Sequence, residues 1–204
     1  MRIIEKYSHL NGEEYLLVHH KKLYKEIMDV IKAVHVFKFR TKISKEKGRK
    51  QGKALWNPIA INAEFKRLFR AKGWKESRRD FYVSFEPSIV RILEPMNFKE
   101  QSQYLDSIGK EKLYSFNQTD FLKDSIAVEV QLGKYFAVTY DLFVKHLSFY
   151  TGRLINVGVE VVPMKSMQKN MSSGPPWFEK EVHNVLRHGR TNPPVPLLIL
   201  GVAP

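Results

Sequence analysis

The chain has 204 residues and no cysteine, and its 34 Lys and Arg against 21 Asp and Glu give a formal net charge of +13. The lack of cysteine excludes disulfides, thiolate zinc sites and a thiol nucleophile, and it fits a cytoplasmic protein. No apolar run approaches the ~18–20 residues of a membrane span, and the N-terminal residues lack the apolar core of a signal peptide, so we expect no membrane partner. The excess of positive charge favours an anionic partner, with nucleic acid as the first candidate.

The length and a hydrophobic fraction of 43% predict one domain spanning residues 1–204. Its first helix is expected over Lys21–Val34, where apolar residues follow helical spacing. A second helix should begin after Asn57, an N-cap residue followed by Pro, and should end near Gly73.

Between these two helices, Lys38–Lys53 carries eight basic residues and one acidic residue. Charge runs of this kind are usually solvated loops. The alternative is an arm that follows a phosphate backbone, mobile when free and ordered on DNA. The sequence alone leaves both interpretations open.

The centre of the chain predicts a strand, a helix and a hairpin. The strand is expected over Phe81–Phe85, and the helix runs from the capping box of Asn97 and Glu100 to Gly109. The hairpin comprises a strand at Leu113–Phe116, a turn region at Asn117–Lys123 and a core strand at Ser125–Gln131.

The last third of the chain alternates helices and strands. Aromatic residues three and four apart in Phe136–Tyr150 predict a long helix whose aromatic stripe packs in the core. The other elements are a strand at Ile155–Val162, whose Glu160 we interpret as structural, a helix from Phe178 towards Gly189 and an apolar strand at Val195–Val202. The order of elements predicts an α/β fold, a mixed central β-sheet flanked by helices on both faces.

Asp120, Glu129 and Gln131 are the candidate residues for chemistry. Side chains two apart on a strand share a face, so Glu129 and Gln131 project together from a strand that is apolar on both sides. A lone buried carboxylate is costly, and a divalent cation shared with Asp120 would offset that cost. Oxygen ligands of this kind suit Mg²⁺. The plainer interpretation, which spacing alone favours, is that these acids are solvated or paired with Lys or Arg.

The segment Lys169–Pro176, KNMSSGPP, is incompatible with a helix or a central strand. Asn170, Ser172 and Ser173 are typical turn residues, and the residues alone favour an ordinary turn. The same short donors and acceptors also suit base edges in a major groove.

Asp120 with Glu129-Val130-Gln131 resembles the PD-(D/E)xK nuclease motif, in a variant with Gln in place of Lys. The longer blocks SFNQTDFLKD, VEVQLGKY, YDLFVKH, VGVEVVPMK and MSSG resemble the group of type II restriction endonucleases that includes BstYI and BglII. The likeness runs from YSHLNG near the start to the closing apolar strand, so it covers almost the whole chain.

This resemblance implies a restriction-endonuclease-like fold and a homodimer that cuts double-stranded DNA at a palindromic site with a GATC core. The implied site is R/GATCY with a four-base 5′ overhang, in a prokaryotic restriction-modification system that has a cognate DNA methyltransferase. Asp120, Glu129 and the carbonyl of Val130 would bind Mg²⁺, and the amide of Gln131 would orient the attacking water. The implied DNA-binding residues are Lys134, Asn170, Ser172, Ser173, Arg40 and Lys42.

Two other functions remain as alternatives. A repair or structure-specific nuclease on the same scaffold would cut DNA without a fixed sequence. A DNA-binding protein with a merely structural acidic cluster would not cut at all. Digestion of a plasmid separates the three, because it gives discrete bands, a smear or no cleavage.

Overall fold

The computed structural model describes residues 1–45 and 51–204 of the chain. Residues 46–50, which belong to the predicted basic segment, lie outside the described residues. Over the described part, six strands form one mixed sheet in the order β1-β8-β7-β6-β5-β4. The central pairs β6–β7 and β7–β8 are parallel, and the outer pairs are antiparallel.

The strands of this sheet are β1 (Arg2–His9), β4 (Lys75–Val83), β5 (Leu113–Lys123), β6 (Ile126–Val130), β7 (Val157–Pro163) and β8 (Leu197–Ala203), and a separate short pair is formed by β2 (Lys42–Ile43) and β3 (Ala54–Leu55). The α-helices are α1 (Gly12–His19), α2 (Lys21–Ala33), α3 (Pro58–Ala71), α4 (Pro87–Leu93), α5 (Phe98–Ser107), α6 (Ala137–Tyr140), α7 (His146–Thr151), α8 (Lys165–Gln168) and α9 (Phe178–Arg187). A 3₁₀ turn, η1 (Val36–Phe39), follows α2, and a π-helical turn, η2 (Asp141–Lys145), joins α6 to α7.

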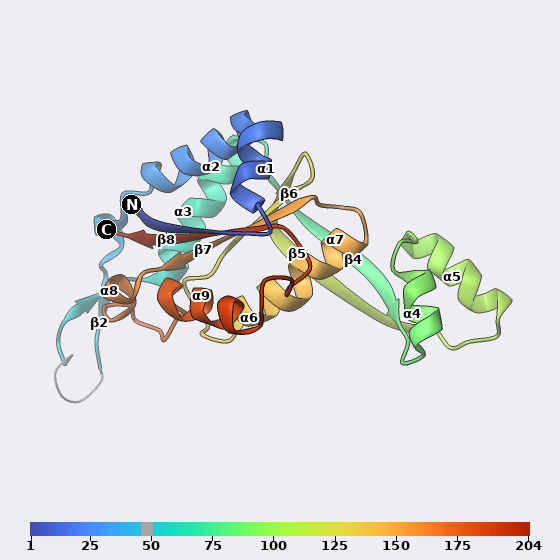
Figure 1. The fold of residues 1–204 in the computed structure, drawn as a ribbon. Coiled ribbons are helices and arrows are strands. Elements are labelled where there is room, and N and C mark those ends of the chain that lie inside the picture. Colours follow the sequence, from blue (N-terminus) through green and yellow to red (C-terminus); the bar gives the residue numbers. More distant parts are fainter. Residues whose placement is uncertain (46–50) are drawn as a thin grey trace.

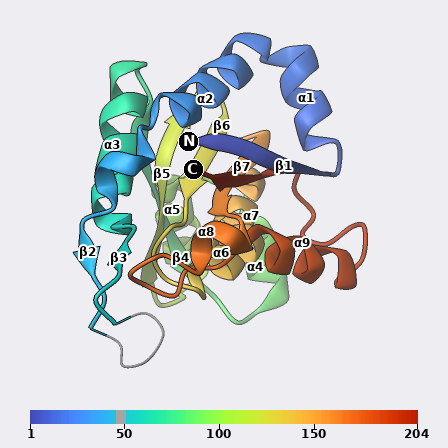
Figure 2. The same cartoon turned by 90° about the vertical axis from the view of Figure 1, so that its left-hand side faces the viewer.

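Helices cover both faces of the sheet, which confirms the predicted fold class. Helices α1, α2 and α3 lie on one face, and α6 to α9 lie on the other (Figures 1 and 2). Strands β6, β7 and β8 are buried along their whole length between these layers. Such double coverage is typical of parallel strands that carry near-continuous apolar runs.

Several local predictions are confirmed. The α2 and α3 helices start where their sequence patterns place them, and the side chain of Asn57 accepts a hydrogen bond from the backbone of Ala60. Asn97 and Glu100 form the expected capping box of α5. Gly73 and Gly109 follow the helix ends with φ of 82° and 62°, in the left-handed region that glycine tolerates best.

The predicted turn at Asn117–Lys123 is wrong, because these residues belong to β5. The turn of the hairpin is Asp124–Ser125, whose φ values of 44° and 63° are both positive, as in two-residue hairpin turns. A polar side chain buried within β5 is tolerated where it meets a partner from elsewhere in the fold. For example, the hydroxyl of Tyr140 donates to the side chain of buried Asn117 at 2.7 Å.

The predicted strand at Phe81–Phe85 is displaced, since β4 covers the charged stretch Lys75–Val83 and ends before Phe85. An edge strand has only one neighbour, so charged side chains can reach water from it. The elements not predicted from the sequence include β1, α1, β2, β3, α4 and α8.

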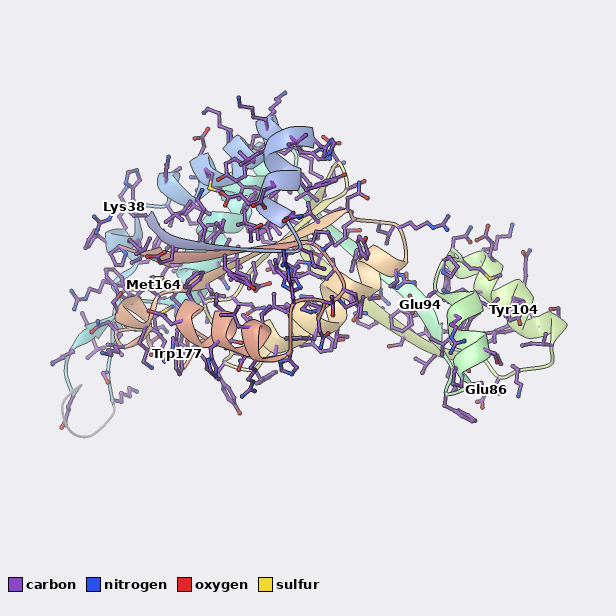
Figure 3. All side chains as sticks on the ribbon, viewed as in Figure 1. Lys38, Glu86, Glu94, Tyr104, Met164 and Trp177 are labelled. Atoms are coloured by element: carbon purple, nitrogen blue, oxygen red, sulfur yellow. The ribbon has the colours of Figure 1, made fainter. Side chains whose placement is uncertain are left out.

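The antiparallel pair β4–β5 extends beyond the other strands of the sheet and carries α4 and α5 at its far end (Figure 1). Glu94 lies where this lobe meets the body, while Glu86 and Tyr104 lie farther out (Figure 3). The buried side chain of Arg79 links the two parts, because one guanidinium nitrogen donates to the Ser148 carbonyl at 2.5 Å and the other to Glu94 Oε2 at 3.0 Å.

The predicted helix Phe136–Tyr150 is interrupted by the π turn η2, and its predicted orientation is wrong. The aromatic side chains of Phe136, Tyr140 and Tyr150 are exposed. Val138, Leu142 and Phe149 are buried instead. The helix therefore turns its other face to the sheet, and that face also carries two charged residues of the candidate site.

Candidate active site

Asp120 and Glu129 lie on neighbouring strands of the central sheet. The β5–β6 pairing is regular from Lys123 to Phe121, and Phe121 lies opposite Val128. One residue further along, Asp120 leaves this ladder, and its Oδ2 atom accepts the backbone N–H of Val130 at 3.3 Å. The carboxylate of Asp120 thus lies at the fork between the two strands, near enough to Glu129 for its charge to act on the Glu129 carboxyl.

Glu129 is buried, with a side-chain exposure of 1%. Burial raises the pKa of its carboxyl well above the ordinary value, and the negative charges of Asp141 and Asp120 act in the same direction. Its Oε1 atom lies 2.9 Å from the ammonium of Lys145. Its Oε2 atom is buried and has no hydrogen-bond partner among the described residues. A buried carboxyl oxygen without a hydrogen-bond partner is a ready ligand for a cation.

Gln131 follows two residues later and is held by two hydrogen bonds. Its backbone N–H donates to the carbonyl of Val161 at 3.0 Å, which continues the sheet beyond β6. Its side-chain nitrogen donates to Asp141 Oδ2 at 2.7 Å. Its orientation therefore depends on a residue of the helical layer.

Val130, the residue between them, projects to the opposite side of the strand. Together with Asp120 it lines a cavity of about 160 Å³ against Asn62 and Phe65 of α3. Asp120 therefore contacts the backbone of Val130, the residue after Glu129, and its charge acts on the buried Glu129 carboxyl, while Gln131 follows on the same face of the strand as Glu129.

Asp141 and Lys145 were missed by the sequence reasoning. They form an ion pair of 2.7 Å across η2, and both face the sheet. Burial raises the pKa of Asp141. Burial alone would lower the pKa of Lys145, but the carboxylates of Glu129 and Asp141 outweigh it and raise that pKa. Acidic and basic residues four apart on a helix are a common surface pair, so no sequence signal distinguished this buried one.

Glu160 and His146 form a second buried pair next to the site. Glu160 lies directly opposite Glu129 in the parallel β6–β7 ladder. Its Oε2 atom is 3.4 Å from His146 Nε2. Burial raises the pKa of Glu160 well above its ordinary value and lowers the pKa of His146 to about 3. His146 is therefore neutral near pH 7, and burial disfavours the charged form of Glu160.

The donor set at this site fits a hard divalent cation. Asp120 and Glu129 supply carboxylate oxygens, and one oxygen of Glu129 is buried without a hydrogen-bond partner in the described structure. Mg²⁺ commonly binds through one or two carboxylates and keeps several waters. No group of three or more His, Cys, Asp or Glu arranged to hold a metal occurs within residues 1–45 and 51–204, so a metal here relies on two acids.

Four of the residues predicted to bind DNA gather around one cleft of about 640 Å³. Lys42 of β2, Lys134, Ser172 and Ser173 all line it. The Ser172 N–H donates to the Trp56 carbonyl at 3.0 Å, and the Ser173 hydroxyl donates to the Leu132 carbonyl at 3.4 Å, so three chain segments meet here.

The other two predicted residues line a neighbouring cavity of about 290 Å³ instead. Arg40 lies over the indole ring of Trp56, 5.3 Å from its centroid, and its Nε donates to the Ala54 carbonyl at 3.0 Å. Asn170 donates to the Ser166 carbonyl at 3.4 Å. Trp56 lines this second cavity, whereas its chain neighbours Leu55 and Asn57 line the larger cleft.

With this geometry in place, comparison with known proteins identifies the family. The family model described as "Restriction endonuclease BglII/BglIII" matches residues 4–202. The chain belongs to the BglII/BglIII family of restriction endonucleases. Members of this family are type II site-specific deoxyribonucleases that depend on a divalent metal ion, so the chain is an enzyme that binds and cleaves DNA.

Solved structures support the same fold. The chain aligns over 100% of its length with 79% of BglII in a crystal structure "complexed with DNA 16-mer", at a TM-score of 0.64 and 17% identity. Against free BglII it covers 100% of itself and 80% of that chain, at a TM-score of 0.57 and 14% identity. No curated protein matched in sequence. Among the described helices, none has the length and apolar character needed to cross a membrane.

Proposed function

We propose that this BglII-family enzyme hydrolyses double-stranded DNA with Mg²⁺ at a palindromic site with a GATC core. The proposed site is R/GATCY, as for BstYI, and the proposed product is a four-base 5′ overhang. A methyltransferase of the same prokaryotic restriction-modification system would protect the host sites.

The observation that carries this proposal is the pair of carboxylates at the β5–β6 fork. Glu129 keeps a buried oxygen without a hydrogen-bond partner within the described chain, and Asp120 is beside it. Asp120, Glu129 and the carbonyl of Val130 would hold the ion. Mg²⁺ bound there would acidify a water and offset negative charge on the phosphate.

Gln131 takes the position that a lysine has in the common motif. Its amide carries no charge and is no base at neutral pH. Its nitrogen already donates to Asp141, so its oxygen is the atom left to accept a hydrogen bond from the attacking water. We assign Gln131 to orienting that water.

Base reading is assigned to the cleft lined by Lys42, Lys134, Ser172 and Ser173. A serine hydroxyl can donate or accept, so it suits a position where either purine is allowed. The structure of BglII on a DNA 16-mer supports the view that this fold holds a duplex. Arg40, Asn170 and the remaining positive charge would contact phosphates, with a steep dependence on salt.

A palindrome is matched by a two-fold symmetric homodimer in which each subunit cuts one strand. The exposed stripe of Phe136, Tyr140, Val144 and Tyr150 along α6, η2 and α7 is our candidate for the contact between subunits. Contiguous exposed apolar residues commonly mark such interfaces.

The test of the metal site is the pair of variants Asp120→Asn and Glu129→Ala. Each should lose cleavage of plasmid DNA with Mg²⁺ by about 100-fold or more, which is the scale of removing one transition-state charge stabiliser. Both should keep specific binding in a gel-shift assay. Asp124→Asn is the matched control, because Asp124 is an exposed acid in the hairpin turn and Asn tolerates its positive φ.

Digestion of a plasmid followed by sequencing of the cut ends then tests the site. Discrete fragments ending in GATC overhangs are expected. Wild-type cutting by either metal-site variant would remove Asp120 and Glu129 from the mechanism, and a smear would refute the fixed site.

A further inference from the structure

The π turn η2 ends at Lys145, whose ammonium lies in the carboxylate site. Lys145 Nζ lies 2.9 Å from Glu129 Oε1 and 2.7 Å from Asp141 Oδ1. The side chain of Lys145 is 13% exposed, whereas those of Glu129 and Asp141 are 1% and 2% exposed. Single π turns within α-helices frequently occur at functional sites. Lys145 is the last residue of this turn, and its ammonium contacts a carboxylate of the sheet.

Asp141 connects Lys145 to Gln131, the position after β6 at which the common motif has a lysine. Its Oδ1 atom contacts Lys145, and its Oδ2 atom accepts from the amide of Gln131. Strand position 131 is neutral, and the positive charge of the site comes from the helical layer instead. The arrangement is held together by contacts among four side chains from β6, the residue after it and η2.

A cation therefore already touches one of the proposed metal ligands. A divalent ion that approaches Glu129 meets an ammonium at contact distance from the same carboxylate, and the two like charges repel. The negative charges that act on Glu129 are those of Asp141 and Asp120, and Asp141 already contacts Lys145 and Gln131. A DNA phosphate adds the further negative charge that favours a second cation in this small volume.

We propose that Lys145 is a positioning residue that acts through Glu129 to make binding of the divalent ion conditional on bound DNA. The inference rests on the proposed metal site at Asp120 and Glu129, and it adds a residue that is absent from the strand motif. Without DNA, the ammonium satisfies Glu129 and weakens metal binding. With DNA, the phosphate offsets the added charge, and the ion binds beside Lys145.

Thermodynamic linkage gives this proposal two independent readouts. If DNA tightens metal binding by some factor, the metal must tighten DNA binding by the same factor. Both quantities are binding constants, so neither depends on cleavage. A purely structural role for Lys145 would change thermal stability and would leave this factor unchanged.

The experiment measures Mn²⁺ affinity by electron paramagnetic resonance, on the full chain with and without a duplex. The duplex carries AGATCT and a bridging methylene at the scissile phosphate, which blocks hydrolysis and keeps the charge. Lys145→Met and Lys145→Gln both remove the ammonium, and Gln keeps a polar group if Met disturbs folding. Lys145→Arg is the control that keeps the positive charge.

For wild type and Lys145→Arg, we expect DNA to tighten Mn²⁺ binding by about 10-fold or more, a typical coupling between sites. For Lys145→Met and Lys145→Gln, the DNA-free affinity should rise and the coupling should fall to about twofold or less. Fluorescence anisotropy of the labelled duplex with and without Mn²⁺ should give the same factors. Equal coupling in wild type and in the neutral variants would overturn the proposal, as would an absence of coupling in wild type.

Failure of this inference is distinguishable from failure of the proposed function. If Asp120→Asn and Glu129→Ala abolish cleavage while the neutral Lys145 variants keep wild-type coupling, the proposed metal site is supported and the proposed role of Lys145 is refuted. If Asp120→Asn and Glu129→Ala cut normally, the metal site itself is wrong.

Discussion

The buried pair of His146 and Glu160 makes the stability of this enzyme sensitive to acid. His146 is 1% exposed, and its ring packs against Gly158, where even an added Cβ would lie only 2.4 Å from Nδ1. Burial lowers the pKa of His146 from 6.5 to about 3, and the neighbouring Lys145 charge adds to that effect. Protonating His146 in the folded state would place a second positive charge beside the candidate site.

The sign and size of the effect follow from linkage. The unfolded chain binds a proton at His146 below pH 6.5, whereas the folded chain does so only near pH 3. The contribution of His146 to stability is therefore fully present above pH 6.5 and is lost as the pH falls towards 3. Each pH unit below 6.5 costs about 1.4 kcal/mol, so the free energy of unfolding should fall by ~2 kcal/mol between pH 6.5 and pH 5 from this group alone.

Urea unfolding at fixed protein concentration, followed by circular dichroism at pH 7.5 and pH 5, measures this loss. His146→Gln keeps a side chain able to hydrogen bond Glu160 but does not titrate, so its loss between the two pH values should be ~2 kcal/mol smaller than that of wild type. His183→Gln is the control, since His183 is exposed on α9. If wild type and His146→Gln lose equal stability on acidification, His146 is not held neutral by burial and the reasoning is refuted.

Two further predictions concern packing and base preference. Gly158→Ala should lower the free energy of unfolding by ~1–3 kcal/mol, because its Cβ would overlap the His146 ring. Gly174→Ala is the control, because an added Cβ there meets open space. Equal melting temperatures of the two variants would contradict the packing account. Ser173→Ala should change the preference between AGATCT and GGATCC duplexes more than the total cleavage rate, as measured by competition digests. Ser107→Ala is its exposed control on α5, and an unchanged preference in Ser173→Ala would remove Ser173 from outer-base reading.

The sequence by itself determined the elements whose signals are local. The N-cap at Asn57 and the capping box of Asn97 and Glu100 are encoded within four residues, and each appears in the structure as predicted. The apolar run before Gln131 specified a covered central strand, because only a fully buried position favours so continuous an apolar sequence. Since Asp120 and Glu129 flank a single short hairpin, their proximity was also predictable from their separation along the chain.

The tertiary structure alone decided which polar residues are paired and which faces are buried. Asn117 lies in a strand because Tyr140, from a helix, completes its hydrogen bonding. The aromatic stripe of Phe136–Tyr150 has a regular helical spacing, but spacing does not tell which face packs on the sheet, and the face with Asp141 and Lys145 is the one that does. The charge balance around Glu129 was therefore invisible in the sequence, because it depends on the docking of a helix whose own residues would pair equally well in water.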